Sequence, residues 1–329
     1  AGSAGDSGRN VLVRTGALLL QALPLAILLF VLFPRLPGPF WGIGTGESAR
    51  TGLGDEMTPG DISDLSVSGE VAFRVRFAGE MPPPAQRYWR GPVLHEFDGR
   101  SWRRPRAQAF PSQEVTYLGE PVEYQITLEP TDRPWILALD IPAEWPEREA
   151  FRTYDFQLVA PRRLSEVSSF RLRSYPSFIA GVELPQSLRR KGLQLPEESN
   201  PRSRALARDL VERYGDPQAI AQAMLTMFRE QPFVYTLDPP KLADNAMDEF
   251  LFETRRGFCE HYASAFTLVM RAAGVPARVV TGYQGGEFNP LGGYLVVRQS
   301  DAHAWSEIWV AGRGWLRVAF PAPSTRRRQ

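Results

Sequence analysis

Short runs in which apolar and polar residues alternate follow residue 65, and this period of two predicts β-strands. Clusters rich in proline or glycine separate the runs, as is typical of loops between strands. The runs lie at 71–77, 122–128, 135–139, 156–160 and 170–175. We therefore predict a β-rich domain, a sandwich or a barrel-like sheet, over residues 65–180.

The second half of the chain changes to helical spacing. Residues 200–215 and 217–231 carry apolar side chains three or four positions apart, which predicts two amphipathic helices. A third helix is predicted from about Cys259 to Ala273, where a glycine and a nearby proline end it. Four strands are then expected at 277–283, 292–299, 304–310 and 314–318. Residues 181–329 thus read as an α+β domain, with a small antiparallel sheet packed against the third helix.

An uncharged apolar run extends from residue 17 to residue 33. At a rise of about 1.5 Å per residue it reaches the short end of the roughly 17–25 residues that cross a bilayer. A signal peptide is the alternative, but there is no initiator methionine, and no small-residue cleavage site follows Phe33. We predict a transmembrane helix at 17–33, after a polar segment at 1–16 and before a linker at 34–64. The missing start also suggests that a longer protein has earlier spans.

Charge and composition limit the classes of partner. The chain has 38 basic and 37 acidic residues, so its net charge is only +1. No extended basic field is available for nucleic acid, and we expect no nucleic-acid partner. A length of 329 residues with 43% hydrophobic content suffices for about two globular domains.

Aromatic and basic residues are concentrated between residues 88 and 104, in a pattern that predicts a hairpin around the turn at Asp98 and Gly99. The hairpin also contains His95. One interpretation makes it a wall of a substrate site. We favour the other, in which its aromatic side chains fill the core of the domain or its interface. Those side chains are Tyr88, Trp89, Phe97 and Trp102.

Cys259 is the only cysteine, so it cannot form a disulfide within this chain. It falls in the first turn of a predicted helix, where unsatisfied N–H groups favour an anion and are expected to lower the pKa of a thiol. His303, one of three histidines, begins a predicted strand of the sheet that packs on that helix. Such a pair can act as thiolate and imidazolium, which indicates acyl transfer at a thiol.

The segments GFCEHYASAFTLVMRAAGVPARVVTGY and SDAHAWSEIWVAGRGWLRV resemble the core of the transglutaminase-like superfamily. Together with the membrane span and the YWRG…DGRSW hairpin, they resemble the TgpA-like bacterial proteins. The resemblance implies a papain-like core that projects into the periplasm from the bacterial inner membrane. It makes Cys259 the nucleophile and His303 the general base and acid, without metal or cofactor. Tyr235 loosely matches an upstream aromatic residue that can support the oxyanion.

The third position of the family's triad departs from the pattern. After the strand GWLRV the family has Asp-Pro-Thr, whereas this chain has Ala319 where the orienting aspartate is expected. A methyl group cannot accept the imidazole N–H bond, and loss of such an acceptor cost about 10⁴-fold in a serine protease. Asp301 could substitute, although a turn residue at the strand entry is the simpler interpretation.

The resemblance implies attack of the Cys259 thiolate on a glutamine or other amide of a protein or peptide, with transfer of the acyl group to an amine or to water. We expect Ala319 to impair this activity. A second interpretation is a catalytically silent binding or scaffold protein of the bacterial envelope. A third, a zinc site made by Cys259, His261 and His303, lacks the paired short spacing of zinc motifs.

Overall fold

The computed structural model describes residues 14–16, 18, 20–24, 53–59, 67–105 and 110–320. The chain divides into two units, residues 1–45 and residues 46–329. In the first unit the described residues are helical. Within the described ranges, no helix is both long enough and apolar enough to span a bilayer. The rest of the predicted membrane helix at 17–33 and most of the linker at 34–64 lie outside the described residues, so the span stays a prediction.

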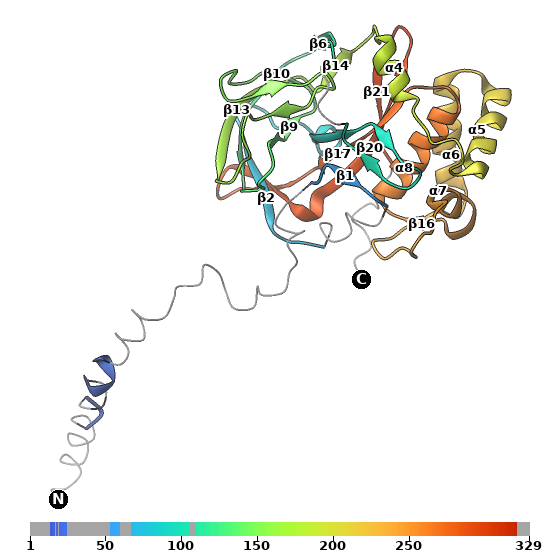
Figure 1. Cartoon of the computed structure of the whole chain (residues 1–329). Helices are drawn as coiled ribbons and strands as arrows, with labels where there is room; N and C mark the ends of the chain where they lie inside the picture. The colour runs from blue at the N-terminus through green and yellow to red at the C-terminus, as the bar shows by residue number, and fades with distance from the viewer. Residues whose placement is uncertain are drawn as a thin grey trace, which may run out of the picture. The chain divides into compact units, whose positions relative to one another are not determined.

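A six-stranded antiparallel sheet forms one layer of the second unit (Figure 1). Alternate side chains of its central strands are buried, among them Phe73, Ile126 and Phe170, while the side chains between them face outward. The predicted period of two thus gives this sheet one apolar and one polar face. Its order is β10 (Pro142–Glu144), β13 (Ser168–Ser174), β7 (Val122–Leu128), β2 (Val71–Phe77), β19 (Tyr294–Arg298) and β18 (Glu287–Asn289).

A five-stranded antiparallel sheet forms the second layer. Its order is β21 (Gly314–Val318), β20 (Ala302–Val310), β17 (Ala277–Gln284), β3 (Tyr88–Leu94) and β9 (Ala138–Leu139). The ring of Phe73 from the first sheet meets Trp89 and Tyr283 of the second edge-on, at centroid distances of 5.3 and 5.4 Å. These aromatic contacts join the apolar faces of the two sheets.

Strands from both halves of the chain share both large sheets. β3 comes from the predicted β-rich region but pairs with β17, and β19 comes from the second half but pairs with β2. Residues 46–329 accordingly form one compact unit, and the division near residue 180 stays a prediction. We predicted that the aromatic side chains of the 88–104 hairpin fill the core. This prediction is confirmed, because all four are buried: Tyr88, Trp89, Phe97 and Trp102.

The helices cover one side of the five-stranded sheet (Figure 1). They are α4 (Gln186–Gly192), α5 (Pro201–Tyr214), α6 (Pro217–Glu230), α7 (Ala246–Glu249), the π-helical turn η3 (Phe250–Thr254) and α8 (Cys259–Ala272). The Asp216 carboxylate caps α6 by accepting the N–H of Ala219. α8 lies between β20 on one side and α5, α6 and α7 on the other, and all but the last of its 14 residues are buried.

Three predicted strands differ clearly from the structure, and one of them, the run at 156–160, is reduced to the two residues of β12 (Leu158–Val159). The run at 135–139 is interrupted at Leu137, so that β8 (Trp135–Ile136) and β9 belong to different sheets. The run at 292–299 is shortened at its start by a glycine turn. Further short elements are β1 (Glu56–Met57), η2 (Pro84–Gln86), β4 (Glu96–Phe97), β5 (Trp102–Arg103), β6 (Val115–Leu118), β11 (Phe151–Arg152), β12 (Leu158–Val159), β14 (Ser177–Ala180), β15 (Val234–Tyr235), β16 (Arg256–Gly257) and η4 (Gln299–Asp301).

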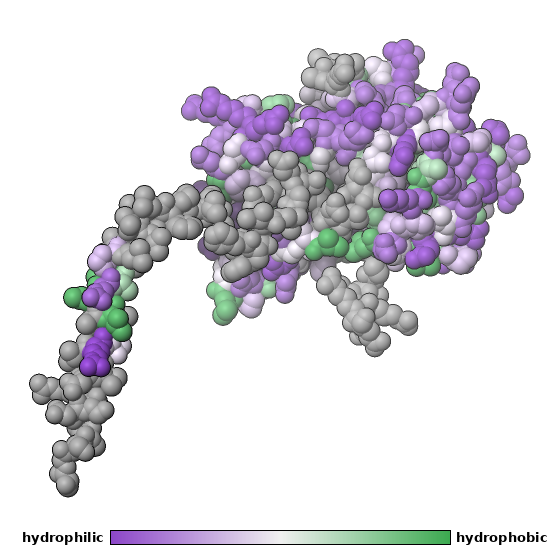
Figure 2. Space-filling view, turned by 60° about the horizontal axis from the view of Figure 1, so that its bottom comes forward, coloured by the Kyte–Doolittle hydropathy of each residue, from purple (hydrophilic) through white to green (hydrophobic). Residues whose placement is uncertain are grey.

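Figure 2 shows that the viewed face of the second unit is mostly hydrophilic, with few apolar spots. Most buried apolar side chains instead belong to one large core cluster, which includes α8 and both sheets, and two smaller clusters hold most of the others. This distribution is that of a globular unit whose helix α8 is central to the core.

Candidate active site

Cys259 is the first residue of α8, and the short strand before it sets its position. β16 pairs in parallel with β15, and its last residue is Gly257. A Cβ atom on Gly257 would lie 2.6 Å from Cγ of His261, so only glycine allows the chain to pass this close to the helix. The thiol residue is only 1% exposed. The local sequence thus places the single thiol at the buried start of the central helix.

The hydroxyl group of Tyr235 contacts both the backbone and the side chain of Cys259. The Cys259 N–H donates to this hydroxyl over 3.3 Å, and the hydroxyl also hydrogen-bonds the sulfur. The Tyr235 ring is held parallel to Tyr262 at a centroid distance of 6.0 Å. Burial raises the pKa of Tyr235, so its hydroxyl is a neutral group beside the thiol.

Burial raises the pKa of the Cys259 thiol to about 12, and the neighbouring Glu260 adds to the rise. The N–H of Ala304 and the hydroxyl of Tyr235 bond to the sulfur and act in the opposite direction. A helix start contributes about 0.3–1 kcal/mol at an exposed site, whereas burying an unpaired charge costs several kcal/mol. The expected lowering of the thiol pKa is therefore wrong for this closed arrangement, in which the thiol is neutral.

His303 lies on β20 directly before Ala304, whose N–H reaches the Cys259 sulfur. Its imidazole packs near the ring of Tyr88, at a centroid distance of 6.5 Å. Burial lowers the pKa of His303 to about 4, so the ring is neutral at pH 7. In the described part of the chain, its Nε2 atom is buried and has no hydrogen-bond partner. The fold therefore brings thiol and imidazole to the same end of β20 and leaves one imidazole nitrogen unsatisfied.

Ala319 follows β21 at the His303 end of the sheet. The register ends with Val318 opposite Ser306, and continued by one residue it would bring position 319 beside Trp305. Directly opposite residues share a face of a sheet, and so do residues two apart on one strand. A side chain at position 319 thus lies on the face that carries His303. The methyl group there cannot accept a hydrogen bond, which agrees with the unpartnered Nε2 atom.

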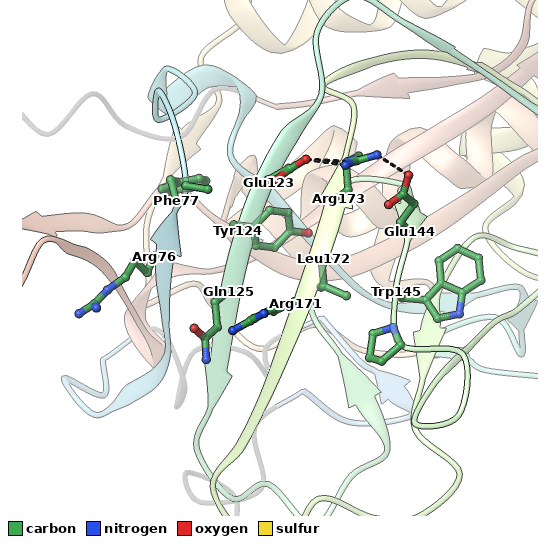
Figure 3. Close-up of a pocket in the computed structure, with 12 residues that line it drawn as sticks. Arg76, Phe77, Glu123, Tyr124, Gln125, Glu144, Trp145, Arg171, Leu172 and Arg173 are labelled. Atoms are coloured by element: carbon green, nitrogen blue, oxygen red, sulfur yellow. Dashed lines mark hydrogen bonds and ion pairs between the residues drawn. The ribbon is translucent and has the colours of Figure 1, made fainter.

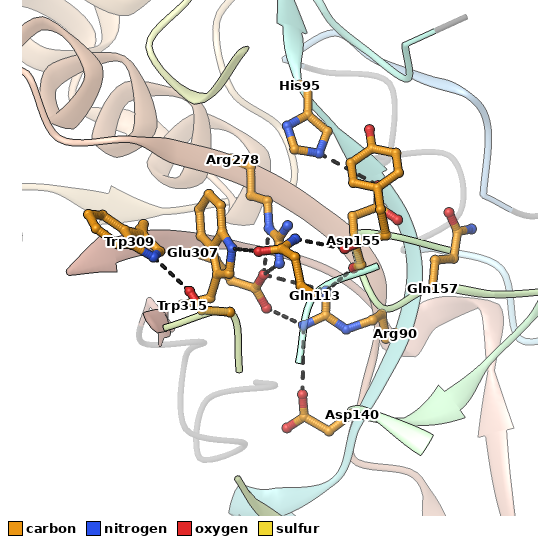
Figure 4. Close-up of polar contacts among 12 residues, drawn as sticks. Arg90, His95, Gln113, Asp140, Asp155, Gln157, Arg278, Glu307, Trp309 and Trp315 are labelled. Carbon is orange, nitrogen blue, oxygen red and sulfur yellow. Dashed lines mark hydrogen bonds and ion pairs between the residues drawn. The ribbon is translucent and has the colours of Figure 1, made fainter. Parts of the chain in front are cut away.

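A buried cluster of charges fixes the strand that carries His303 (Figure 4). Glu307, four residues later on β20, pairs with Arg90 of β3 and with Arg278 of β17, the latter at 2.8 Å. Burial by itself raises the pKa of the Glu307 carboxyl, but the two guanidinium groups lower it to about 2. Glu307 is consequently ionised, and it ties β20 to two neighbouring strands.

The same cluster extends to the ring that packs near His303. Asp140 lies 3.8 Å from Arg90 and pairs closely with Arg317 of β21. The Arg317 guanidinium in turn lies 4.1 Å from the centroid of the Tyr88 ring. Our sequence reasoning missed this cluster. The sequence does contain a sign of this cluster. Arg90 and Glu307 are charged residues that each lie within an otherwise apolar strand pattern, which indicates that they are buried and paired.

The other candidate residues have structural surroundings. His261 accepts the N–H of Phe258 at Nδ1 over 3.4 Å, and burial lowers its pKa to about 4. The Asp301 carboxylate accepts the N–H of Arg298 over 2.8 Å, as expected of a turn residue. Within the described ranges, no group of three or more His, Cys, Asp or Glu side chains could hold a metal ion, so Cys259, His261 and His303 do not form the zinc site considered above.

Comparison with known proteins gives matches over nearly the whole chain. Residues 1–179 match the TgpA N-terminal domain, and residues 201–320 match the transglutaminase-like superfamily. A protein-glutamine gamma-glutamyltransferase of Pseudomonas aeruginosa is 45% identical over 305 residues, which cover 92% of this chain and 45% of that protein. The uncharacterized protein YebA of Bacillus subtilis is 33% identical over 131 residues, 38% of this chain and 18% of that protein. This chain thus spans less than half the length of either relative.

The crystal structure of the periplasmic domain of TgpA from Pseudomonas aeruginosa, bound to ethylmercury, superposes with a TM-score of 0.79. The two are 43% identical, and the match covers 82% of this chain and 96% of that domain. The fold and the motifs define a transglutaminase-like protein. More narrowly, the chain belongs to the TgpA family, in which a TgpA N-terminal domain precedes a transglutaminase-like core.

Proposed function

We propose that this chain carries out transglutaminase-type acyl transfer on proteins, with Cys259 as the nucleophile. The observation that carries the proposal is the position of the single thiol at the start of α8, where the N–H of Ala304, the residue that follows His303 on β20, acts on the thiol and lowers its pKa. The name of the Pseudomonas relative, protein-glutamine gamma-glutamyltransferase, supports the same reaction class and protein glutamine as the substrate.

In the proposed reaction, the sulfur of Cys259 attacks the carboxamide carbon of a glutamine side chain, and a C–S bond forms. The thiol proton passes to His303, which returns it to the leaving nitrogen, so that the C–N bond breaks and ammonia departs. An amine or a water molecule then attacks the thioester. His303 takes a proton from that acceptor, the C–S bond breaks, and the thiol is regenerated.

The electrostatics of the closed site define what substrate binding must do. Burial keeps both Cys259 and His303 neutral. Proton transfer from thiol to imidazole creates a charge pair inside a low-dielectric site, which is favourable only if both charges gain hydrogen-bond donors or acceptors. We infer that the ion pair forms during attack rather than in the resting protein.

Tyr235 is proposed to support the oxyanion. Its hydroxyl and the Cys259 N–H are bonded to each other in the closed site. When the carbonyl oxygen of a substrate enters between the hydroxyl and the N–H, both groups can donate a hydrogen bond to that oxygen. Preorganised donors of this kind stabilise the developing negative charge, and removal of one has cost about 10²–10³-fold in a serine protease.

Ala319 is proposed to weaken the activity. Among the described residues, an imidazolium at position 303 would have no acceptor for its buried Nε2 proton. A catalytically silent envelope protein with a binding or scaffold role is the second candidate, and the same unpartnered nitrogen is the observation that favours it. The impaired enzyme and the silent scaffold protein have the same fold and the same unpartnered nitrogen. Only a measurement of activity distinguishes them.

The compartment and the anchor belong to the same proposal. The TgpA relative was crystallised as a periplasmic domain, and the apolar run at 17–33 is long enough for a membrane helix. We propose that the chain is anchored in the bacterial inner membrane with residues 46–329 in the periplasm, where protein or peptide glutamines are its substrates. Nucleic acid and metal have no role in this scheme.

The test is incorporation of a fluorescent primary amine into a glutamine-containing donor protein. The full chain, its Ala319→Asp variant and its Cys259→Ala variant are compared in detergent. Activity that is low in the parent, higher in the Ala319→Asp variant and absent without the thiol supports an impaired enzyme. Silence in both thiol-containing forms favours the scaffold alternative.

A further inference from the structure

A cavity of about 530 Å³ opens on the six-stranded sheet, where β2, β7, β13 and β10 lie side by side (Figure 3). Its lining comes from these four strands and from the residues that follow β2 and β10, Trp145 among them. Cys259, Tyr235 and His303 are not part of the lining. The cavity is therefore separate from the candidate active site.

Both carboxylates of the cavity are already paired. Arg173 donates to Glu123 from Nε over 3.0 Å and also pairs closely with Glu144 (Figure 3). These three side chains form a closed unit across β7, β13 and β10. The remaining charged residues of the lining are two arginines. Their guanidinium groups are the positive charges that remain available to bind a ligand.

The two arginines, Arg76 and Arg171, have no ion-pair partner within the described chain, and both are exposed. Among the described residues, the hydrogen bond that Arg76 donates goes to the carbonyl oxygen of Gly292, over 3.2 Å. The register pairs Gln125 with Arg76 on one side and with Arg171 on the other. The three residues thus form a row across three strands, with the two arginine Cα atoms about 10 Å apart.

We propose that this row binds an acidic, extended segment of the protein substrate, which makes the cavity a docking site remote from the nucleophile. That the ligand is a substrate rests on the proposed acyl-transfer function. Each guanidinium group offers a fork of N–H donors that fits a carboxylate, and the Gln125 amide between them can bond to the peptide backbone.

The dimensions of the row fit a peptide. In an extended chain, acidic side chains two to four residues apart are separated by about 7–13 Å. The long side chains of Arg76 and Arg171 can reach two such carboxylates at once. Trp145 at the β10 end of the cavity offers an aromatic surface to a neighbouring apolar side chain.

The test is direct binding of a fluorescein-labelled decaglutamate peptide to the full chain in detergent, followed by fluorescence anisotropy. This peptide contains neither glutamine nor lysine, so binding is independent of acyl transfer and is measured equally well in the Cys259→Ala variant. A Gly-Ser peptide of equal length gives the uncharged reference, and oligogalacturonate serves as a carboxylated competitor that is not a peptide.

The decisive double variant combines Arg76→Gln with Arg171→Gln. The matched control double variant combines Arg189→Gln with Arg190→Gln on α4, and it removes the same amount of charge away from the cavity. We expect the first pair to weaken decaglutamate binding about tenfold, since each charge-assisted contact contributes about threefold, and the second pair to change it less than twofold. Equal weakening by both pairs, no binding by the parent chain, or stronger binding of oligogalacturonate than of the peptide would each overturn the proposal. A melting curve for each variant verifies that it is folded.

Discussion

The backbone N–H of Cys259 donates a hydrogen bond of 3.3 Å to the hydroxyl of Tyr235, and the same hydroxyl bonds to the thiol sulfur. The two residues are 24 positions apart in the sequence and meet because β15 pairs in parallel with β16. The contact closes the start of α8, and it places a hydroxyl group where the oxygen of a bound amide is expected.

Replacement of Tyr235 by phenylalanine tests this contact. If the hydroxyl supports the oxyanion, Tyr235→Phe lowers kcat roughly 100-fold with little change in KM, because the bond strengthens only in the transition state. The measurement is steady-state amine incorporation in an Ala319→Asp background. Tyr214→Phe, on the exposed surface of α5, is the matched control. A rise in KM with unchanged kcat would instead make Tyr235 a binding residue.

Restoration of the third triad position is the second prediction. Ala319→Asp places a carboxylate on the face of the sheet that carries His303, and we expect at least about 100-fold more amine incorporation, by comparison with the roughly 10⁴-fold loss when such an orienter is removed. Ala319→Asn is the matched control, since an amide accepts a hydrogen bond but brings no charge. An unchanged rate in both variants would show that Nε2 does not limit the reaction.

The reactivity of the thiol toward iodoacetamide should depend steeply on pH. Because burial raises the pKa of Cys259 well above that of an ordinary thiol, little thiolate is present at pH 7, and the alkylation rate should keep rising from pH 7 to pH 10. Mass spectrometry assigns the product to the single cysteine. A plateau near pH 7 would mean that the thiol is already ionised in the resting protein.

Acid should destabilise the fold between pH 6.5 and pH 4. Burial lowers the pKa values of His95, His261 and His303 to about 4. In this pH range the histidines of the unfolded chain are protonated, whereas those of the folded chain are not. The free energy of unfolding therefore falls as the pH decreases, by about 2 kcal/mol per histidine at pH 5. Urea unfolding at pH 7, 6 and 5 measures the slope. His261→Phe should reduce it by about a third, and a flat profile would contradict the burial of these rings.

The buried charge cluster gives a prediction for stability. Glu307→Gln removes the carboxylate that pairs with both Arg90 and Arg278, leaves Arg90 only the more distant Asp140, and should cost about 3–5 kcal/mol in the free energy of unfolding. The comparison is Glu129→Gln, which breaks the half-exposed pair with Arg74 and should cost less than about 1 kcal/mol. Urea unfolding measures both. Similar losses in the two variants would show that burial does not distinguish the pairs.

Local patterns in the sequence predicted the helices near 200–215, 217–231 and 259–273 and most of the strands, and the structure confirms these elements. They also put Cys259 at a helix start and His303 at the start of a strand. Such features depend on residues a few positions apart, through side-chain periodicity and the glycine and proline signals at element ends. The family resemblance, read from the same motifs, is confirmed by the comparisons.

The charge state of the site and the pairing of strands were decided by tertiary structure. β3 enters the sheet beside β17, almost 200 residues later in the chain, and Glu307 meets Arg90 only as a result. The neutral thiol follows from complete burial, which a helix start cannot offset. The row of Arg76, Gln125 and Arg171 likewise exists only through strand register. These relationships depend on contacts between distant segments, and no local pattern in the sequence specifies such contacts.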